Sequence, residues 1–234
     1  MLHDSQGIAV IDLALPAAHV TKNIAAACTS SGCFHIINHG VTVELIERVW
    51  AELDAFFALP LAEKEACARP SPSDYHRYSA FRVENIAAFM GRKGEPNDPI
   101  KKFDFSNAAE GAMTTPNMWP ADRPEFRATM ESYYAALKGV TTQLFGHFAL
   151  ALDVPHEYFS QRTSTAANEI KLKHYPPIQD ATRRFAEHTD SVPFTLLLVD
   201  DSPNALHAKT PLGWVPVAPV PGGLFVNLGN VLQR

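Results

Sequence analysis

The last third of the chain is a series of short apolar segments separated by proline and glycine. Segments of this length, rich in β-branched and aromatic residues, are typical of β-strands. They occupy residues 169–175, 194–199, 205–209, 214–217 and 224–228. Many short strands in succession predict a sheet that closes into a barrel or a jelly roll, because a strand must bury its apolar face against a second layer.

The first two thirds of the chain carry mainly helical patterns. Apolar residues recur at helical spacing over residues 18–30, from Ile46 to Phe57, and from Pro124 to Leu152, where proline suits the first turn. Short strands are expected at residues 7–13 and 33–37, and residues 74–99, which lack a sustained period, are expected to form a loop. The predicted fold class is therefore mainly β with flanking helices, the longest helix backing a sheet.

Amino-acid composition and net charge limit the classes of protein to which this chain can belong. The 234 residues are 46% hydrophobic, which is enough for one large domain or two small ones. A net charge of −5 gives no basic field for nucleic acid or anionic lipid, so a small-molecule partner is expected. No apolar segment approaches a membrane span and no signal peptide is recognisable, which predicts a cytoplasmic protein. Cys28, Cys33 and Cys67 are expected to be reduced thiols. The sequence contains no feature that indicates the oligomeric state.

One motif, His188-Thr189-Asp190, carries metal chemistry. In an extended strand alternate side chains share a face, so His188 and Asp190 are expected to point the same way. An imidazole and a carboxylate suit a divalent iron with open positions for substrate and oxygen. The same tripeptide also fits a surface turn. The apolar run at 194–199, closed by turn residues, favours a pair of ligands at one end of a buried strand.

Five motifs extend this interpretation, because they recur in the same order in one family. They are Gly-Cys-Phe-His-Ile-Ile-Asn-His-Gly (32–40), Phe-Phe-Ala-Leu-Pro (56–60), His-Tyr-Pro-Pro (174–177), His-Thr-Asp (188–190) and Pro-Val-Pro-Gly-Gly-Leu-Phe-Val-Asn-Leu-Gly (219–229). From about Ile8 to Arg234 the chain resembles the isopenicillin N synthase-like branch of the iron(II)- and 2-oxoglutarate-dependent dioxygenases. The resemblance implies a double-stranded β-helix, or distorted jelly roll. It implies an N-terminal region at 1–105, a connector with the long helix at 106–165, and a jelly-roll core at 166–234 that lacks its last strands.

The resemblance also implies the cofactors. Its members use Fe(II), 2-oxoglutarate and O₂ to hydroxylate, desaturate or cyclise a small metabolite. His188 and Asp190 match two of the three metal ligands. The second histidine ligand and an Arg-x-Ser pair for 2-oxoglutarate are expected beyond Arg234, which implies a truncated chain. Within the chain, His174 and His207 are candidates for the third ligand, although each also fits an ordinary strand residue.

Binding residues are expected on two further segments. Lys171, Lys173 and Tyr175 share one face of a strand; the usual polar-out rule places the lysines in solvent. The resemblance instead implies that Tyr175 faces the iron pocket and the cofactor, and the lysines would follow it. Arg77, which precedes Tyr78 where relatives commonly have glycine, fits either a bidentate partner for a substrate carboxylate or a surface residue. Tyr78 is the other substrate-binding candidate.

Two alternatives remain open. One is an iron oxidase of the same fold that uses no 2-oxoglutarate, and the other is a non-catalytic fragment or binding protein. Asn38-His39-Gly40 is interpreted as a structural turn, because asparagine and glycine tolerate positive φ.

Overall fold

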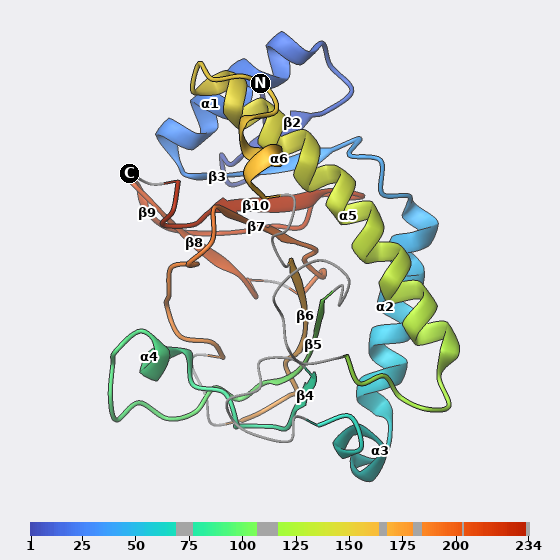
Figure 1. Ribbon diagram of the computed structural model, residues 1–234. Coiled ribbons are helices and arrows are strands. Elements are labelled where there is room, and N and C mark those ends of the chain that lie inside the picture. The colour runs from blue at the N-terminus through green and yellow to red at the C-terminus, as the bar shows by residue number, and fades with distance from the viewer. Residues whose placement is uncertain (69–76, 107–116, 164–167, 180–183, 203, 233–234) are drawn as a thin grey trace. The chain divides into compact units, whose positions relative to one another are not determined.

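The computed structural model describes residues 1–68, 77–106, 117–163, 168–179, 184–202 and 204–232 (Figure 1). Contacts divide the chain into two compact units, each assembled from separate stretches. Unit 1 comprises Met1–Val43, Leu137–Thr163 and Thr189–Arg234, and unit 2 comprises Glu44–Ala136 and Ser164–His188. The three sequence regions expected at 1–105, 106–165 and 166–234 do not coincide with these units and stay a prediction. Tyr75 and His76, in the motif before Arg77, lie outside the described residues.

Unit 1 is built on a mixed sheet with the strand order β1-β2-β3-β10-β7 in the described part of the chain. The strands are β1 (Leu2–His3), β2 (Ala9–Asp12), β3 (Cys33–Ile37), β10 (Leu224–Leu228) and β7 (Phe194–Leu197). β2 and β3 are parallel and are joined by α1 (Ala17–Ser30), because parallel neighbours need a crossover connection. The strand, helix and strand expected at the start of the chain are confirmed.

The two faces of this sheet bury different partners. Leu224 and Val226 pair with Ile36 and Phe34, so these four side chains share one face, and each is fully buried. Figure 1 shows α1 over the sheet, and Val20, Ile24 and Ala27 of α1 are also buried. On the other face, Cys33 and Phe225 pack with a cluster that includes residues of the hairpin β8 (His207–Thr210) and β9 (Gly213–Pro216).

One expectation about strand burial is wrong. The segment at 194–199 is predicted from its apolar run to be buried on both faces, yet every residue of β7 is only half-buried. The reason is its position, because β7 is an edge strand of the described sheet, whereas β10 pairs on both sides.

Unit 2 contains a second sheet, ordered β4-β5-β6. Its strands are β4 (Arg77–Ser79), β5 (Lys101–Ser106) and β6 (Glu169–His174). The helices are α2 (Val43–Ala58), α3 (Leu61–Glu65), α4 (Ile86–Phe89) and the first half of α5 (Pro124–Ala151), whose second half belongs to unit 1 together with α6 (Tyr158–Thr163). The loop expected at 74–99 is therefore wrong in part, since it contains β4 and α4.

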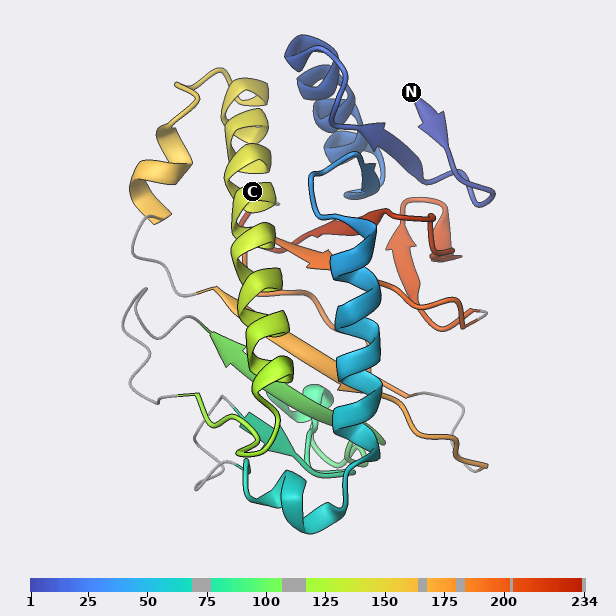
Figure 2. The same cartoon turned by 90° about the vertical axis from the view of Figure 1, so that its right-hand side faces the viewer.

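Aromatic side chains fill the space between this sheet and its helices. The rings of Phe56 (α2) and Phe126 (α5) stack with centroids 5.0 Å apart, and Phe103 of β5 lies 4.9 Å from Phe56. All three side chains are at most 1% exposed. Figure 2 shows α2 and the first turns of α5 side by side in front of β5 and β6. The helical spacing in the sequence thus predicts the buried stripe of α2.

The second half of α5 packs in unit 1, where Phe145 and Phe148 lie 5.0 and 5.2 Å from the ring of Phe194 in β7. The expectation that the long helix backs a sheet is confirmed. Within the described ranges, no helix is both long enough and apolar enough to cross a bilayer.

The three cysteines are free thiols, as expected. Cys33 and Cys67 are buried, and burial raises the pKa of Cys28 to about 11. At neutral pH Cys28 is therefore protonated and a poor nucleophile.

Replacing Phe56 by alanine is expected to lower the free energy of unfolding by about 3–5 kcal/mol, because the lost ring leaves a cavity between Phe103 and Phe126. Phe89→Ala is the matched control. The side chain of Phe89 is 69% exposed, so a change within about 0.5 kcal/mol is expected. Urea denaturation of both variants measures the difference, and equal losses would contradict the assigned core.

Candidate metal centre

His188 lies at the end of unit 2, in a segment without strand pairing; the extended strand expected for residues 188–190 is wrong. Its Nδ1 is 2.8 Å from the carbonyl oxygen of Ala186. Since a carbonyl only accepts, Nδ1 carries a proton, and in the neutral ring Nε2 then carries the lone pair. This arrangement is typical of metal-binding histidines, whose other ring nitrogen donates to a carbonyl or carboxylate. The ring also meets Phe185 edge-to-face, with centroids 4.9 Å apart.

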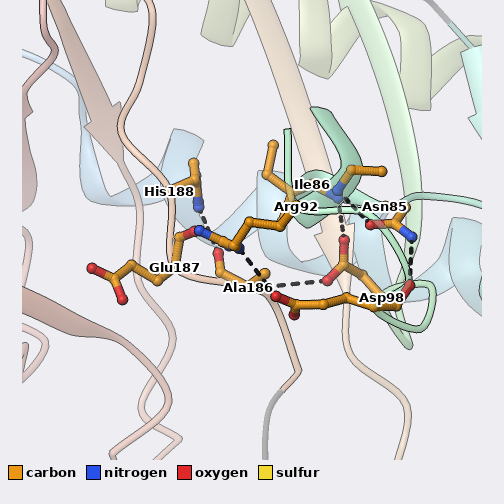
Figure 3. Close-up of polar contacts among 9 residues, drawn as sticks. Asn85, Ile86, Arg92, Asp98, Ala186, Glu187 and His188 are labelled. Atoms are coloured by element: carbon orange, nitrogen blue, oxygen red, sulfur yellow. Dashed lines mark hydrogen bonds and ion pairs between the residues drawn. The ribbon is translucent and has the colours of Figure 1, made fainter. Parts of the chain in front are cut away.

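The backbone beside His188 is held by side chains from residues 85–98 (Figure 3). Asp98 accepts a hydrogen bond from the amide of Ala186 at 3.2 Å and another from the amide of Ile86 at 2.7 Å. Arg92 donates to the carbonyl of Glu187 at 2.6 Å. Sequence reasoning missed these residues, since they fall in the expected loop and belong to no motif.

Asp190 lies in unit 1, where two side chains donate to the same carboxylate oxygen. The hydroxyl of Thr195 donates to Oδ2 at 2.5 Å, and the amide of Asn227 donates to it at 2.8 Å. Thr195 and Asn227 are direct partners across β7 and β10, so their side chains share a face. Because two donors occupy Oδ2, a metal ion bound through one oxygen would take Oδ1.

The loop that carries Asp190 is fixed to the segment after β10. The amide of Asn230 donates to the carbonyl of Asp190, and the amide of Gly229 donates to that of Pro193, both at 2.9 Å. A Cβ on Gly229 would lie 1.8 Å from the carbonyl oxygen of Val192, so only glycine allows this approach. The sequence motif at 219–229 contains Asn227 and Gly229, but their roles become visible only from the hydrogen bonds.

These two donors fit Fe(II), which accepts a mixed set of imidazole nitrogen and carboxylate oxygen. The boundary between the units falls after His188. Only Thr189 separates the two ligands along the chain, which limits the distance between their Cα atoms to about 7 Å. Among the described residues, no three His, Cys, Asp or Glu side chains converge into a metal site.

The two in-chain candidates for the third ligand have other surroundings. The ring of His174 stacks on Phe57 at 5.0 Å, on the aromatic face of the second sheet. His207 is exposed on β8, opposite Pro216. The third ligand stays a prediction beyond Arg234, outside the described residues.

A charged face covers the other side of the sheet in unit 2. Across the strands, Asp104 of β5 lies opposite Arg77 of β4 on one side and opposite Lys171 of β6 on the other. Lys102 lies opposite Lys173 of β6. Paired residues share a face, so these five side chains lie opposite the aromatic core. Asp104 is 1% and Lys102 8% exposed, so the part of the charged face that β5 carries is buried. Lys171, in contrast, is exposed.

Ion pairs order this charged face. Lys102 pairs with Asp104 and, at 3.4 Å, with Glu84, while Lys171 pairs with Glu169 at 2.9 Å. Burial, opposed by Lys102, raises the pKa of Asp104 to about 6. The Lys171 side chain is 46% exposed, and its partial desolvation lowers the pKa of the ammonium, but the charges of Glu169 and Asp104 outweigh this effect and raise that pKa above its ordinary value.

The cofactor-binding candidates lie on or beside this face. The ammonium of Lys173 lies 4.0 Å from the centroid of the Phe185 ring, which in turn contacts His188. The structure thus brings Lys173 near the predicted metal ligand. Tyr175 directly follows β6 and is 42% exposed.

The two substrate-binding candidates point to opposite faces. Tyr78 is 1% exposed, with its ring 6.1 Å from that of Phe56, which places it in the aromatic core. Arg77 is on the charged face and is 7% exposed, so its interpretation as a surface residue is wrong. Its φ of 101° lies in the region that favours glycine, the residue expected here in relatives. In proteins generally, residues other than glycine that adopt such strained backbone conformations are rare, and they occur preferentially at functional sites.

The Asn38-His39-Gly40 turn is structural. Asn38 and Gly40 have φ of 54° and 85°. The Nδ1 of His39 accepts from the amide of Val41, and its Nε2 donates to the carbonyl of Gly222, so both ring nitrogens are engaged.

Comparison with known proteins gives the class. Residues 8–122 match the family described as the N-terminal region of non-haem dioxygenases in morphine synthesis, and residues 166–234 match the 2OG-Fe(II) oxygenase superfamily. A 2-oxoglutarate-Fe(II) type oxidoreductase of Aspergillus fumigatus is 31% identical over 99% of this chain and 70% of its own length. The proline hydroxylase buaE of Petromyces alliaceus is 30% identical over 91% of the chain and 69% of its own length.

A solved structure supports the fold. A 2OG-Fe(II) oxygenase family protein of Caulobacter crescentus superposes with a TM-score of 0.84 at 24% identity, covering 98% of this chain and 76% of the other. The expected jelly-roll architecture is confirmed, with sheets that are not closed in the described residues.

The chain belongs to the Fe(II)- and 2-oxoglutarate-dependent oxygenase superfamily, in its isopenicillin N synthase-like branch. It is thus an oxidoreductase of the dioxygenase class, whose cofactors are Fe(II) and 2-oxoglutarate and whose co-substrate is O₂.

Thr195→Val is expected to weaken binding of Mn(II), a redox-stable substitute for Fe(II), about tenfold, because Asp190 loses one of the two donors that orient its carboxylate. Thr195→Ser keeps the hydroxyl and should restore the affinity. Thr142→Val removes a hydroxyl that bonds only within α5 and serves as the control. Calorimetric titration measures all three, and unchanged affinity in Thr195→Val would refute the orienting role.

Proposed function

We propose that the full-length protein binds Fe(II) through Nε2 of His188 and Oδ1 of Asp190 and oxidises a small metabolite in the cytoplasm. The observation that carries the proposal is the orientation of each ligand by its own hydrogen bonds. The Nδ1 of His188 donates to a carbonyl, and Oδ2 of Asp190 accepts two donors. In each ligand the atom opposite these hydrogen bonds is the one suited to a metal.

The protein's contribution is to bind and orient the reactants. When bound, iron and 2-oxoglutarate together supply the two-electron oxidant, as dioxygen is reduced and 2-oxoglutarate is decarboxylated to succinate and CO₂. Tyr175, Lys173 and Lys171 are proposed to bind 2-oxoglutarate. Their position on and beside the charged face, with Lys173 over Phe185, supports this role. A histidine beyond Arg234 is proposed as the third ligand.

In the full-length protein, His188→Ala and Asp190→Ala are each expected to reduce O₂ uptake and succinate release, with Fe(II) and 2-oxoglutarate supplied, to the background without enzyme. His207→Ala, on exposed β8, is the control and should keep the wild-type rate. Turnover in both ligand variants would mean that the metal site is wrong. O₂ uptake without succinate would favour the oxidase alternative, and an inactive wild type that binds no iron would favour a binding protein.

Arg77 is proposed to bind an anionic group of the substrate, preferably a carboxylate. The support is its position on the charged face, its burial and its strained φ of 101°. A guanidinium matches a carboxylate by two parallel hydrogen bonds. One relative is named a proline hydroxylase, and free proline carries a carboxylate, which is compatible with this class. Tyr78, the other substrate-binding candidate, lies on the opposite face in the aromatic core and is not part of this proposal.

Comparing Arg77→Gly with Arg77→Ala separates backbone strain from side-chain loss. Both variants lose the guanidinium, but only glycine relieves the strain at positive φ, so Arg77→Gly should be more stable by about 1 kcal/mol. The ligand assay is a thermal-shift screen of small carboxylic acids and their primary amides, with Mn(II) and 2-oxoglutarate held constant. At least one acid, and not its amide, should stabilise the wild type and neither variant. Equal shifts in all three proteins would contradict the role of Arg77.

A further inference from the structure

The segment that carries His188 receives two hydrogen bonds from a single loop. The amide of Ala186 donates to Oδ1 of Asp98 at 3.2 Å, and the carbonyl of Glu187 accepts from Arg92 at 2.6 Å. Figure 3 shows both contacts reaching the chain immediately before His188. The peptide groups on either side of the Ala186 carbonyl, between residues 185 and 186 and between residues 187 and 188, are therefore fixed by residues 88 and 95 positions earlier in the sequence.

Asp98 is well suited to hold this segment. Asp98 is only 4% exposed. Its second carboxylate oxygen, Oδ2, accepts a hydrogen bond from the amide of Ile86 at 2.7 Å. Its own amide donates to the carbonyl of Glu84 at 2.7 Å. One buried carboxylate thus ties the start of α4 to Ala186, which is itself 2% exposed.

The loop has its own internal supports. Asn85 accepts from the amide of Ala88 at 2.8 Å and donates to the carbonyl of Glu95 at 3.0 Å. The guanidinium of Arg92 also donates to the carboxylate of Glu95 at 3.1 Å. Asn85 and Glu95 therefore hold Arg92 and α4 in place.

The position of Ala186 decides the state of the histidine ring. Its carbonyl accepts the Nδ1 proton of His188, so a shift of this peptide group would release the ring and allow the proton to move to Nε2. A ring with its proton on Nε2 presents the wrong nitrogen to the metal.

We propose that Asp98, assisted by Arg92, is the positioning residue for His188: it fixes the carbonyl of Ala186 and thereby selects the tautomer whose Nε2 binds the metal. The proposal deepens the function proposed above and rests on it for the metal. The selection of the tautomer is built into the chain and precedes metal binding.

The test uses the full-length protein and the variants Asp98→Asn, Asp98→Ala and Arg92→Ala. Asparagine has one acceptor oxygen in place of two, so either Ile86 or Ala186 loses its acceptor. Asp200→Asn, which affects an exposed turn in unit 1, is the matched control for Asp98. Arg127→Ala, which breaks an exposed pair with Glu131, is the control for Arg92.

The first readout is the ¹⁵N chemical shifts of the His188 ring in metal-free protein, at about pH 8 where histidine is ordinarily neutral. The wild type and both controls should show a single tautomer with the proton on Nδ1, and the Asp98 variants a mixture. The second readout is Mn(II) affinity by calorimetry, which should fall about tenfold in Asp98→Asn and less in Arg92→Ala. If Asp98→Ala does not fold, Asp98→Asn and Arg92→Ala carry the test.

A purely structural role for Asp98 predicts a different result. Asp98→Asn would then lower the unfolding temperature but keep the single tautomer and the wild-type Mn(II) affinity, which would overturn the proposal. Failure of the proposed metal site is recognised separately, since His188→Ala would then leave Mn(II) affinity unchanged. In that case the tautomer readout would still decide whether Asp98 positions the ring.

Discussion

Hydrogen bonds to one polar atom of each proposed metal ligand are the constraint on which the proposed site depends. A carboxylate can present either oxygen and an imidazole either nitrogen, so a ligand pair alone does not define a metal geometry. Here the carbonyl of Ala186 engages Nδ1 of His188, while Thr195 and Asn227 engage Oδ2 of Asp190. These hydrogen bonds join residues of the same unit, so the orientation of each ligand follows from the packing inside that unit.

The charged face of the second sheet combines buried and exposed charges. Burying Asp104 and Lys102 is unfavourable unless they pair, and their pairing keeps charge on a surface that faces away from the aromatic core. Arg77 adds a cation there at the expense of a backbone conformation that glycine adopts freely. A strained residue in this position is understandable if its guanidinium binds the substrate.

The sequence predicts the features that depend on periodicity and on short-range order. Apolar spacing gives α1 and α5 to within one residue and α2 to within three, and the ordered motifs lead to the correct family and its cofactors. Apolar residues that recur every two or every 3.6 residues mark the buried face of a strand or a helix, so they can be recognised without knowing what packs against that face. The expected burial of β7 fails because the edge or centre position of a strand is set by distant pairing.

The residues that orient the site are harder to predict for the same reason. Asp98 and Ala186 are 88 residues apart, and Asp190 and Asn227 are 37 apart. No local sequence pattern distinguishes Asp98 from any other aspartate in a loop. The strand expected for His188 and Asp190 is wrong because contacts with distant residues fix the conformation of that segment. Long-range hydrogen bonds become visible only when the chain is folded.

The most direct test of this account is a crystal structure of the full-length protein loaded with Mn(II), with the ion located by its anomalous scattering. The account predicts one ion bound to Nε2 of His188 and Oδ1 of Asp190, with Nδ1 of His188 still donating to Ala186 and Oδ2 of Asp190 still accepting from Thr195 and Asn227. An ion bound through Nδ1 of His188, or held by His174 or His207 in place of these two ligands, would contradict it.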